Sequence, residues 1–305
     1  MNELKGRSLV SITDYTKEEI IHILDMAEEF EKNQRQKILD GYVISSLFFE
    51  PSTRTRLSFE SAVQYLGGSV IGFASADTTS VRKGESLKDT ILTVSNYSDL
   101  IIMRNPIDGS ARYASEVSPV PIINAGDGAN QHPTQCLLDL YSIRKTQGSL
   151  DNIHIAMIGD LKYGRTVHSL VQALSLFGAT FHFVSPESLK MPSSVKTWIK
   201  KAGLEYHQYT DIMDIMPIAD ILYMTRIQGE RFPDPLEYEK VKNLYILENS
   251  MLAPSKETMR VLHPLPRVNE ITEDVDDNPK AYYFQQAKNG VYVRQALLAA
   301  ILGLK

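Results

Sequence analysis

The stretch Phe48-Phe49-Glu50-Pro51-Ser52-Thr53-Arg54-Thr55-Arg56 decides how the first part of this chain is expected to fold. An apolar, strand-like run that begins at Tyr42 leads into it. After it, apolar residues recur at helical spacing as far as Leu66, and Gly67-Gly68 is a typical helix stop. The stretch is therefore predicted to join the end of a strand to the first turn of a helix.

The first turn of this predicted helix, Ser52 to Arg56, brings together groups that bind anions. Backbone N–H groups without helical partners, the positive end of the helix dipole, hydroxyls and guanidiniums all lie there. The alternative is an ordinary helix cap beside a solvated charged face. A cap explains one hydroxyl, but arginines in a first turn oppose the dipole. The pattern favours an anion site, and phosphate is the anion that fits it best.

Length and composition limit the class of protein. A chain of 305 residues favours two domains, each of about 150 residues. Hydrophobic content of 43% and charged content of 23% are ordinary for a globular protein. The formal net charge of −5 argues against a nucleic-acid-binding protein. An anionic ligand must therefore be met by local groups of arginine and lysine, and no nucleic-acid partner is expected.

The single cysteine, Cys136, excludes an intramolecular disulfide and a thiolate metal cluster. The first fifteen residues contain no apolar core of signal-peptide length. The longest apolar run, residues 296–304, is much shorter than a membrane span. The sequence thus predicts a cytoplasmic protein without a membrane partner.

Strand-like and helix-like segments alternate along the chain, which predicts parallel sheets flanked by helices. The expected fold is α/β with two domains, residues 1–132 plus 288–305 and residues 133–287, and with the active site in the cleft between them. Thr16 and Glu19 form a capping box that opens the first helix. The expected strands are residues 43–49, 69–74, 99–104, 121–125, 153–158, 180–184, 221–225 and 245–247, and further helices are expected at 53–66, 86–97, 109–116, 133–146, 165–177, 193–202 and 291–302.

Polar residues follow five expected strand ends. They are Arg104, the run His132-Pro133-Thr134-Gln135, the run 159–165, Arg226 with Gln228, and the run His263-Pro264-Leu265-Pro266-Arg267. Taken singly, each could be a surface ion pair, a structural histidine or a solvated loop charge. Five strand ends that deliver Arg, His or Gln to one rim favour a binding site. The run 159–165 lacks both the G-x-G-x-x-G spacing and the P-loop Gly-Lys-Ser/Thr, so a nucleotide-dependent dehydrogenase is disfavoured.

These segments together resemble the transcarbamoylase family. Residues 52–56 followed by 132–135 are similar to motifs shared across that family. Residues 160–165, 226–228 and 263–267 are similar to its aspartate branch, because Pro264 stands where the ornithine branch typically has cysteine. The resemblance runs from about Lys5 to the last expected helix.

The resemblance implies an enzyme that transfers the carbamoyl group of carbamoyl phosphate to the amine of L-aspartate, an early step of de novo pyrimidine biosynthesis. It implies that Ser52, Thr53, Arg54 and Thr55 bind the phosphate, and that Arg54 also assists its departure. Thr55, Arg104 and His132 would hold the carbonyl oxygen. Gln135 would fix the carbamoyl NH₂ together with the backbone carbonyl of Pro266.

The same resemblance assigns Arg165 and Arg226 to the carboxylates of aspartate, with Gln228 in support. Guanidiniums suit carboxylates because they pair with them through two hydrogen bonds. The backbone at Leu265 would contact the substrates, and the Leu265–Pro266 bond is expected to be cis. No side-chain general base stands out, so the leaving phosphate is the expected proton acceptor. No metal or organic cofactor is expected.

Family resemblance also places Ser80 and Lys83 on a loop that completes the active site of a neighbouring subunit. A homotrimer is then the smallest complete catalyst, with Lys83 among the catalytic residues, and a regulatory chain is a possible further partner. The domains are expected to close over both substrates. Two alternatives are a transcarbamoylase with an ornithine-type acceptor and a non-catalytic paralogue that binds phosphate.

Overall fold

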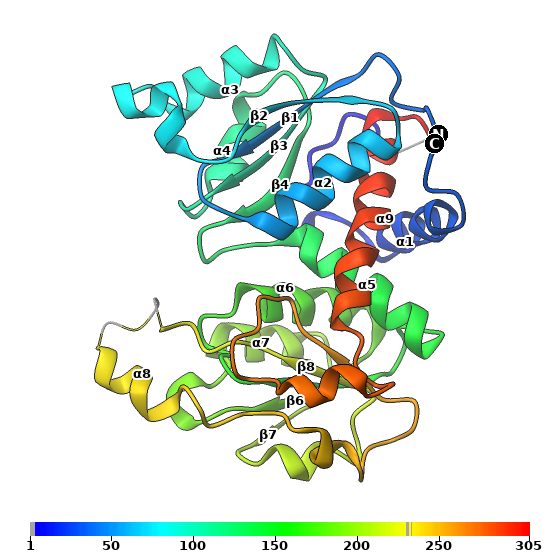
Figure 1. The fold of residues 1–305 in the computed structure, drawn as a ribbon, viewed down its shortest axis with the longest axis vertical. Coiled ribbons are helices and arrows are strands. Elements are labelled where there is room, and N and C mark those ends of the chain that lie inside the picture. Colours follow the sequence, from blue (N-terminus) through cyan, green and yellow to red (C-terminus); the bar gives the residue numbers. More distant parts are fainter. Residues whose placement is uncertain (1–3, 230–231, 233) are drawn as a thin grey trace. The chain divides into compact units, whose positions relative to one another are not determined.

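The computed structural model describes residues 4–229, 232 and 234–305, which form two compact units (Figure 1). Unit 1 comprises Met1–Tyr141 and Ala287–Lys305, and unit 2 comprises Ser142–Gln286. Helices α5 (Pro133–Gln147) and α9 (Tyr283–Leu302) each belong partly to both units. The ligand-binding domains expected from the sequence, residues 1–132 plus 288–305 and residues 133–287, stay a prediction.

Unit 1 contains a four-stranded parallel sheet in the order β2-β1-β3-β4. Its strands are β1 (Val43–Phe48), β2 (Ser69–Phe73), β3 (Leu100–Asn105) and β4 (Ile122–Asp127). Helices α1 (Lys17–Lys32), α2 (Thr53–Tyr65), α3 (Leu87–Ser95) and α4 (Ser110–Val117) alternate with them, and Figure 1 shows α3 and α4 side by side next to the sheet. Buried residues of α3 and α4, such as Ile91 and Ala111, form one core cluster with Leu47, Ile101 and Ile122 of the strands.

Unit 2 contains a five-stranded parallel sheet in the order β7-β6-β5-β8-β9. Its strands are β5 (His154–Ile158), β6 (Thr180–Val184), β7 (Tyr206–Tyr209), β8 (Ile221–Met224) and β9 (Arg260–Leu262). Helices α6 (Arg165–Leu174), α7 (Ser193–Lys201) and α8 (Pro235–Val241) lie between them in the chain. The central strand β5 is buried along Ile155–Ile158, which is the pattern of a parallel strand covered on both faces.

The α/β class and the parallel sheets confirm the prediction from the alternating pattern. The predicted capping box is also confirmed, since Glu19 N–H donates to the Thr16 hydroxyl and Thr16 N–H donates to the Glu19 carboxylate. The strand expected at 245–247 is wrong. Leu247 makes only an isolated bridge to Ile271, and β9 is the strand that pairs with β8.

The segment after β8 leads into α8. Asp234 caps α8, and its side chain accepts a hydrogen bond from Leu236 N–H. Residues 230, 231 and 233 lie outside the described residues. None of the described helices is long and apolar enough to cross a membrane.

Candidate active site

Helix α2 begins where the sequence predicts, directly after β1. Ser52 is its N-cap with an extended backbone, and its side chain makes no capping hydrogen bond. Thr53, Arg54 and Thr55 form the first turn, and Thr55 is buried. The N–H groups of this turn therefore keep their capacity to bind an anion, because the usual side-chain cap does not occupy them.

Arg104 lies at the end of β3, the strand that neighbours β1 in the sheet. Its Nε is 2.7 Å from a Glu50 carboxylate oxygen, and one Nη is 3.4 Å from the Ala125 carbonyl oxygen. Partial burial, and after it the positive charge of Arg104, lower the pKa of the Arg54 guanidinium. Two cations that affect each other in this way repel, so this end of the sheet favours a bound anion.

Arg56, the other arginine of the opening stretch, is engaged elsewhere. Its Nη1 lies 3.2 Å from Glu60 Oε1, one turn further along α2. The Ser46 hydroxyl donates to the same carboxylate oxygen at 3.3 Å. Arg56 is thus a partner of Glu60, and the first turn presents Arg54 as its cation.

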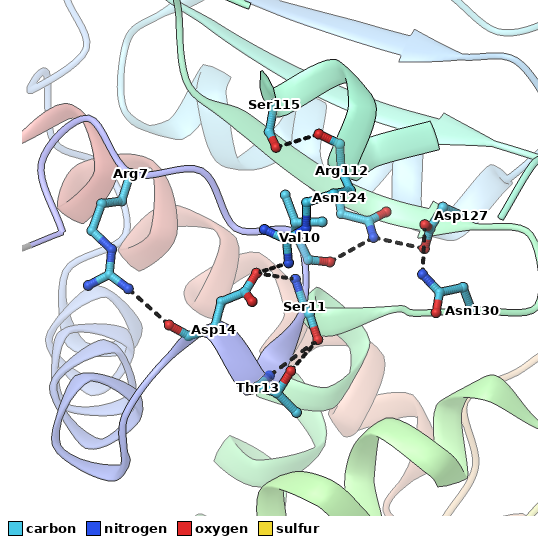
Figure 2. A network of polar contacts seen from close by, with 10 residues as sticks. All are labelled: Arg7, Val10, Ser11, Thr13, Asp14, Arg112, Ser115, Asn124, Asp127 and Asn130. Atoms are coloured by element: carbon cyan, nitrogen blue, oxygen red, sulfur yellow. Dashed lines mark hydrogen bonds and ion pairs between the residues drawn. The ribbon is translucent and has the colours of Figure 1, made fainter. Parts of the chain in front are cut away.

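A buried hydrogen-bond network holds the turn between β4 and His132 (Figure 2). Asp127, which is fully buried, accepts hydrogen bonds from Asn124 at 3.0 Å and from Asn130 at 3.0 Å. The Asn124 amide also donates to the Val10 carbonyl at 2.9 Å, which ties the N-terminal segment to the turn. Asp127 accepts from Gln131 N–H at 3.1 Å as well, directly before His132. This network fixes where the chain delivers His132 to the start of α5.

His132 and Gln135 lie at the first turn of α5, and both are buried. The His132 carbonyl accepts hydrogen bonds from the N–H groups of Gln135 and Cys136, each at 3.1 Å. The Gln135 side chain donates from Nε2 to Asp139 Oδ1 at 2.8 Å. The amide of Gln135 therefore has a set orientation before any ligand is bound.

Ser80 and Lys83 lie on a short 3-10 helix, Ser80–Lys83, and both are exposed. Within the described part of the chain, neither side chain is hydrogen bonded to the other candidate residues of unit 1. In the single chain, both side chains face solvent.

In unit 2, Arg165 is the first residue of α6 and is half-buried. The preceding Gly164 has no room for a side chain, because a Cβ there would lie 2.6 Å from the Asp160 carbonyl oxygen. Asp160 is buried, and its Oδ1 accepts from Tyr163 N–H at 3.0 Å. The turn after β5 therefore holds the start of α6 tightly.

Arg226 and Gln228 follow β8, which pairs with β5. The Thr225 hydroxyl donates to the Ile158 carbonyl at 2.7 Å and accepts from Asp160 N–H at 2.9 Å. It thereby links the ends of β8 and β5, just before Arg226 on one and Arg165 on the other. Carboxyl ends of neighbouring parallel strands meet at one sheet edge, so the two arginines belong to the same edge of unit 2.

The turn after β9 carries Leu265 and Pro266. The Leu265–Pro266 bond is cis, which confirms the expectation, and Leu265 has a φ of 57°. The Leu265 N–H donates to His263 Nδ1 at 2.7 Å, so the proton of this neutral imidazole lies on Nε2. That nitrogen is 2.7 Å from Glu270 Oε1.

Glu270 in turn accepts from the N–H groups of Val268 and Asn269, each at 3.1 Å. Burial works against the ionised form, but the hydrogen bonds from His263 and the backbone outweigh it and lower the pKa of the Glu270 carboxyl. A non-glycine residue at positive φ costs roughly 1–2 kcal/mol. The His263–Glu270 network supports the Leu265 backbone in that conformation.

The structure thus brings the candidate residues to the strand ends of two sheets. Sequence reasoning did not identify the residues that hold them, namely Glu50, Asp127, Asp139, His263 and Glu270. Glu50 lies in the run 48–56 and His263 in the run 263–267, but nothing in the sequence shows which residues they pair with. Among the described residues, no group of three or more His, Cys, Asp or Glu side chains is arranged to hold a metal ion.

Family models identify the class of protein. The carbamoyl-phosphate-binding domain of aspartate/ornithine carbamoyltransferases matches residues 7–145, and the aspartate/ornithine-binding domain matches residues 151–301. The chain therefore belongs to the aspartate/ornithine carbamoyltransferase family.

Similar proteins of known description are of the aspartate type. The aspartate carbamoyltransferase catalytic subunit of Parabacteroides distasonis is 64% identical over 302 residues, which cover 99% of each chain. Aspartate transcarbamoylase from Trypanosoma cruzi, solved in complex with N-(phosphonacetyl)-L-aspartic acid, has a TM-score of 0.93 at 38% identity and covers 99% of this chain and 98% of its own. The catalytic subunit from M. jannaschii has a TM-score of 0.91 at 50% identity, with coverage of 97% and 98%.

Proposed function

We propose that this chain transfers the carbamoyl group of carbamoyl phosphate to the amine of L-aspartate, giving N-carbamoyl-L-aspartate and phosphate. The observation that carries the proposal is the start of α2, where Arg54 lies in a first helical turn without a side-chain cap and Arg104 ends the neighbouring strand. A phosphate dianion would pair with the Arg54 guanidinium and bind the N–H groups of this turn. The T. cruzi relative was solved with carbamoyl phosphate and aspartate, which agrees with this reading.

In the proposed reaction, Ser52, Thr53, Arg54 and Thr55 bind the phosphate of carbamoyl phosphate. Thr55, Arg104 and His132 donate to the carbonyl oxygen, and Gln135 accepts from the carbamoyl NH₂. The neutral amine of aspartate forms the new C–N bond, the C–O bond to phosphate breaks, and the amine proton passes to the departing phosphate. Donors aimed at the developing oxyanion are each worth about 2.7–4 kcal/mol in well-studied enzymes.

Unit 2 supplies the groups proposed for the second substrate. Arg165 and Arg226 would pair with the two carboxylates of L-aspartate, Gln228 would support one of them, and the backbone of Leu265 and Pro266 would contact both substrates. Two guanidiniums at one sheet edge suit a dicarboxylate and disfavour a cationic acceptor such as L-ornithine.

A comparison of turnover with L-aspartate and L-ornithine tests the proposed acceptor. Product is measured as the ureido compound formed from carbamoyl phosphate. We expect turnover with aspartate and at most a trace with ornithine. The reverse preference would identify an ornithine-type enzyme, and binding of carbamoyl phosphate without any turnover would identify a non-catalytic paralogue.

The proposal includes a homotrimer in which Ser80 and Lys83 serve the site of a neighbouring subunit. Their exposed position on a short 3-10 helix supports it, because exposed side chains can reach a second copy of the chain. Inactive Lys83→Ala chains are mixed with inactive Arg54→Ala chains under conditions that allow subunit exchange. Part of the activity is expected to return, because some sites then contain an intact Arg54 from one chain and an intact Lys83 from the other. No recovery, or full activity of a dilute monomer, would contradict shared sites.

The relatives are described as catalytic subunits, which is why a separate regulatory chain is part of the proposed set of partners. The proposed place of the enzyme is the cytoplasm, in de novo pyrimidine biosynthesis.

A further inference from the structure

Among the almost completely buried charged side chains of unit 1 are Asp139 on α5, with 0% exposure, and Arg294 on α9, with 2% exposure. Buried charges are costly unless an opposite charge accompanies them. Burial lowers the pKa of Arg294 to about 9, and the charge of Asp139 acts in the opposite direction. Arg294 is therefore a cation at neutral pH.

Asp139 also contacts a residue of the candidate active site. Its Oδ1 accepts the 2.8 Å hydrogen bond from Gln135 Nε2, one turn earlier on the same face of α5. An ionised carboxylate has no proton to donate, so it can receive only the NH₂ side of the amide. Because the amide is planar, its Oε1 must then point away from Asp139. A neutral partner in place of Asp139 would accept either orientation.

We propose that Asp139 is a positioning residue that fixes the Gln135 amide with its oxygen toward the ligand. The site then selects a ligand whose carbonyl carbon carries an N–H donor, as in a carbamoyl group, over one that carries a methyl group, as in an acetyl group. The two groups are similar in size, so shape alone separates them poorly. A buried acceptor left without its donor, in contrast, rejects the wrong ligand strongly. This inference rests on the proposed function, since it assigns Gln135 to the carbamoyl NH₂.

The probes for a test are two stable phosphonates that differ only at the position in question. Phosphonoacetamide carries CONH₂, and phosphonoacetone carries COCH₃ on the same skeleton. Binding of each to the intact protein is measured by calorimetry. The wild type is expected to bind the amide on the order of 10-fold more tightly than the ketone.

The first variant is Asp139→Asn, which keeps the size of the side chain. Because it leaves Arg294 buried without an opposite charge, it can fail to fold. The double variant Asp139→Asn/Arg294→Met removes both charges together and keeps an apolar side chain over the Phe59 ring, 4.8 Å from the Arg294 guanidinium. Replacement of a buried pair by groups without charge is often tolerated. The double variant therefore keeps the proposal testable.

We expect the double variant to lose most of the roughly 10-fold preference through weaker binding of the amide, with ketone binding changed less than about twofold. Gln135→Ala is expected to lose the same preference. Adding the Asp139 substitution to Gln135→Ala should then have no further effect on selectivity, because Asp139 acts through Gln135.

Equal weakening of both phosphonates would overturn the proposal and leave Asp139 a structural role only. Additive losses of selectivity from Asp139 and Gln135 would overturn it as well. If the wild type bound neither phosphonate, the proposed function itself would fail. If the wild type discriminated and the double variant kept the full preference, only the role of Asp139 would fail.

Discussion

At the start of α2, burial and then the positive charge of Arg104 on β3 lower the pKa of Arg54. In the turn after β9, by contrast, the buried His263 is hydrogen bonded to the buried Glu270. Both regions follow the carboxyl end of a parallel strand, and both carry residues proposed to contact substrate. In unit 1 the N–H groups at the start of α2 have no side-chain cap, and Arg104 pairs with Glu50. In unit 2 the polar groups of the turn after β9 hydrogen bond to one another, and Leu265 has a φ of 57°.

The difference shows two ways of building a binding site. Open charge at the start of α2 costs stability in the absence of a ligand and is compensated when an anion binds. In the turn after β9 the Glu270 carboxylate already has hydrogen-bond donors within the protein, so this network stabilises the fold without a ligand. Substitutions at the first region should therefore change activity with little loss of stability, and substitutions in unit 2 networks should change stability.

The largest expected effect follows from Arg54→Ala. Loss of one charged donor at the reacting group should lower kcat about 10²–10³-fold. The melting temperature should stay the same or rise, because a repulsion with Arg104 is removed. Arg56→Ala is the matched control, since Arg56 lies on the same helix but pairs with Glu60. Equal loss of kcat in both variants would contradict the distinction between the two arginines.

A second expected effect concerns His154, His182 and His207, which lie side by side on β5, β6 and β7. The rings of His154 and His182 are 5.3 Å apart and those of His182 and His207 are 5.4 Å apart. The His154 Nδ1 and His182 Nε2 atoms are 3.0 Å apart, and His182 Nδ1 is 3.2 Å from the Tyr209 hydroxyl. Burial, and then the charges of His154, His207 and Lys256, lower the pKa of His182 from 6.5 to about 4.

Unit 2 should therefore become less stable as the pH falls. Above pH 6.5 His182 is neutral in both folded and unfolded chains, so its full contribution to stability is present. Between pH 6.5 and about 4 only the unfolded chain takes up the proton, and the free energy of unfolding falls by about 3 kcal/mol.

Urea unfolding followed by the fluorescence of Trp198 measures this loss, because the single tryptophan lies on α7 of unit 2. His182→Asn should flatten the pH dependence over this range. His22→Asn, at an exposed position of α1, should leave it as in the wild type. An unchanged slope in His182→Asn would show that other groups carry the pH dependence.

The smallest expected effect concerns the turn after β9 itself. Glu270→Gln keeps the size of the side chain but replaces an anionic acceptor with a neutral one for His263 and two backbone N–H groups. We expect a loss of about 1–2 kcal/mol in the free energy of unfolding and a higher KM for aspartate. Glu273→Gln, on an exposed 3-10 helix nearby, should change stability by less than about 0.5 kcal/mol. If Glu270→Gln lowered kcat without lowering stability, the turn after β9 would behave like the start of α2, which contradicts the proposed difference between the two regions.

Much of the fold was predictable from local patterns. Apolar runs bounded by turn residues predicted the parallel strands, and the Thr16–Glu19 capping box predicted the start of α1. β7 was missed, because Tyr206-His207-Gln208-Tyr209 has no apolar alternation and pairs only along the edge of the sheet. The apolar run at 245–247 was predicted as a strand, but only Leu247 finds a backbone partner, at Ile271.

The sequence by itself predicted which residues would carry the proposed chemistry, because strand ends, helix starts and family motifs are local features of the chain. It determined that Arg54 lies in the first turn of a helix after a strand and that Arg165 begins another helix. Only the tertiary structure decided that Arg56 pairs with Glu60, that Gln135 donates to Asp139, and that Glu270 supports the Leu265 turn through His263. Burial and partners across a core depend on contacts between distant segments, and such contacts have no periodicity along the sequence.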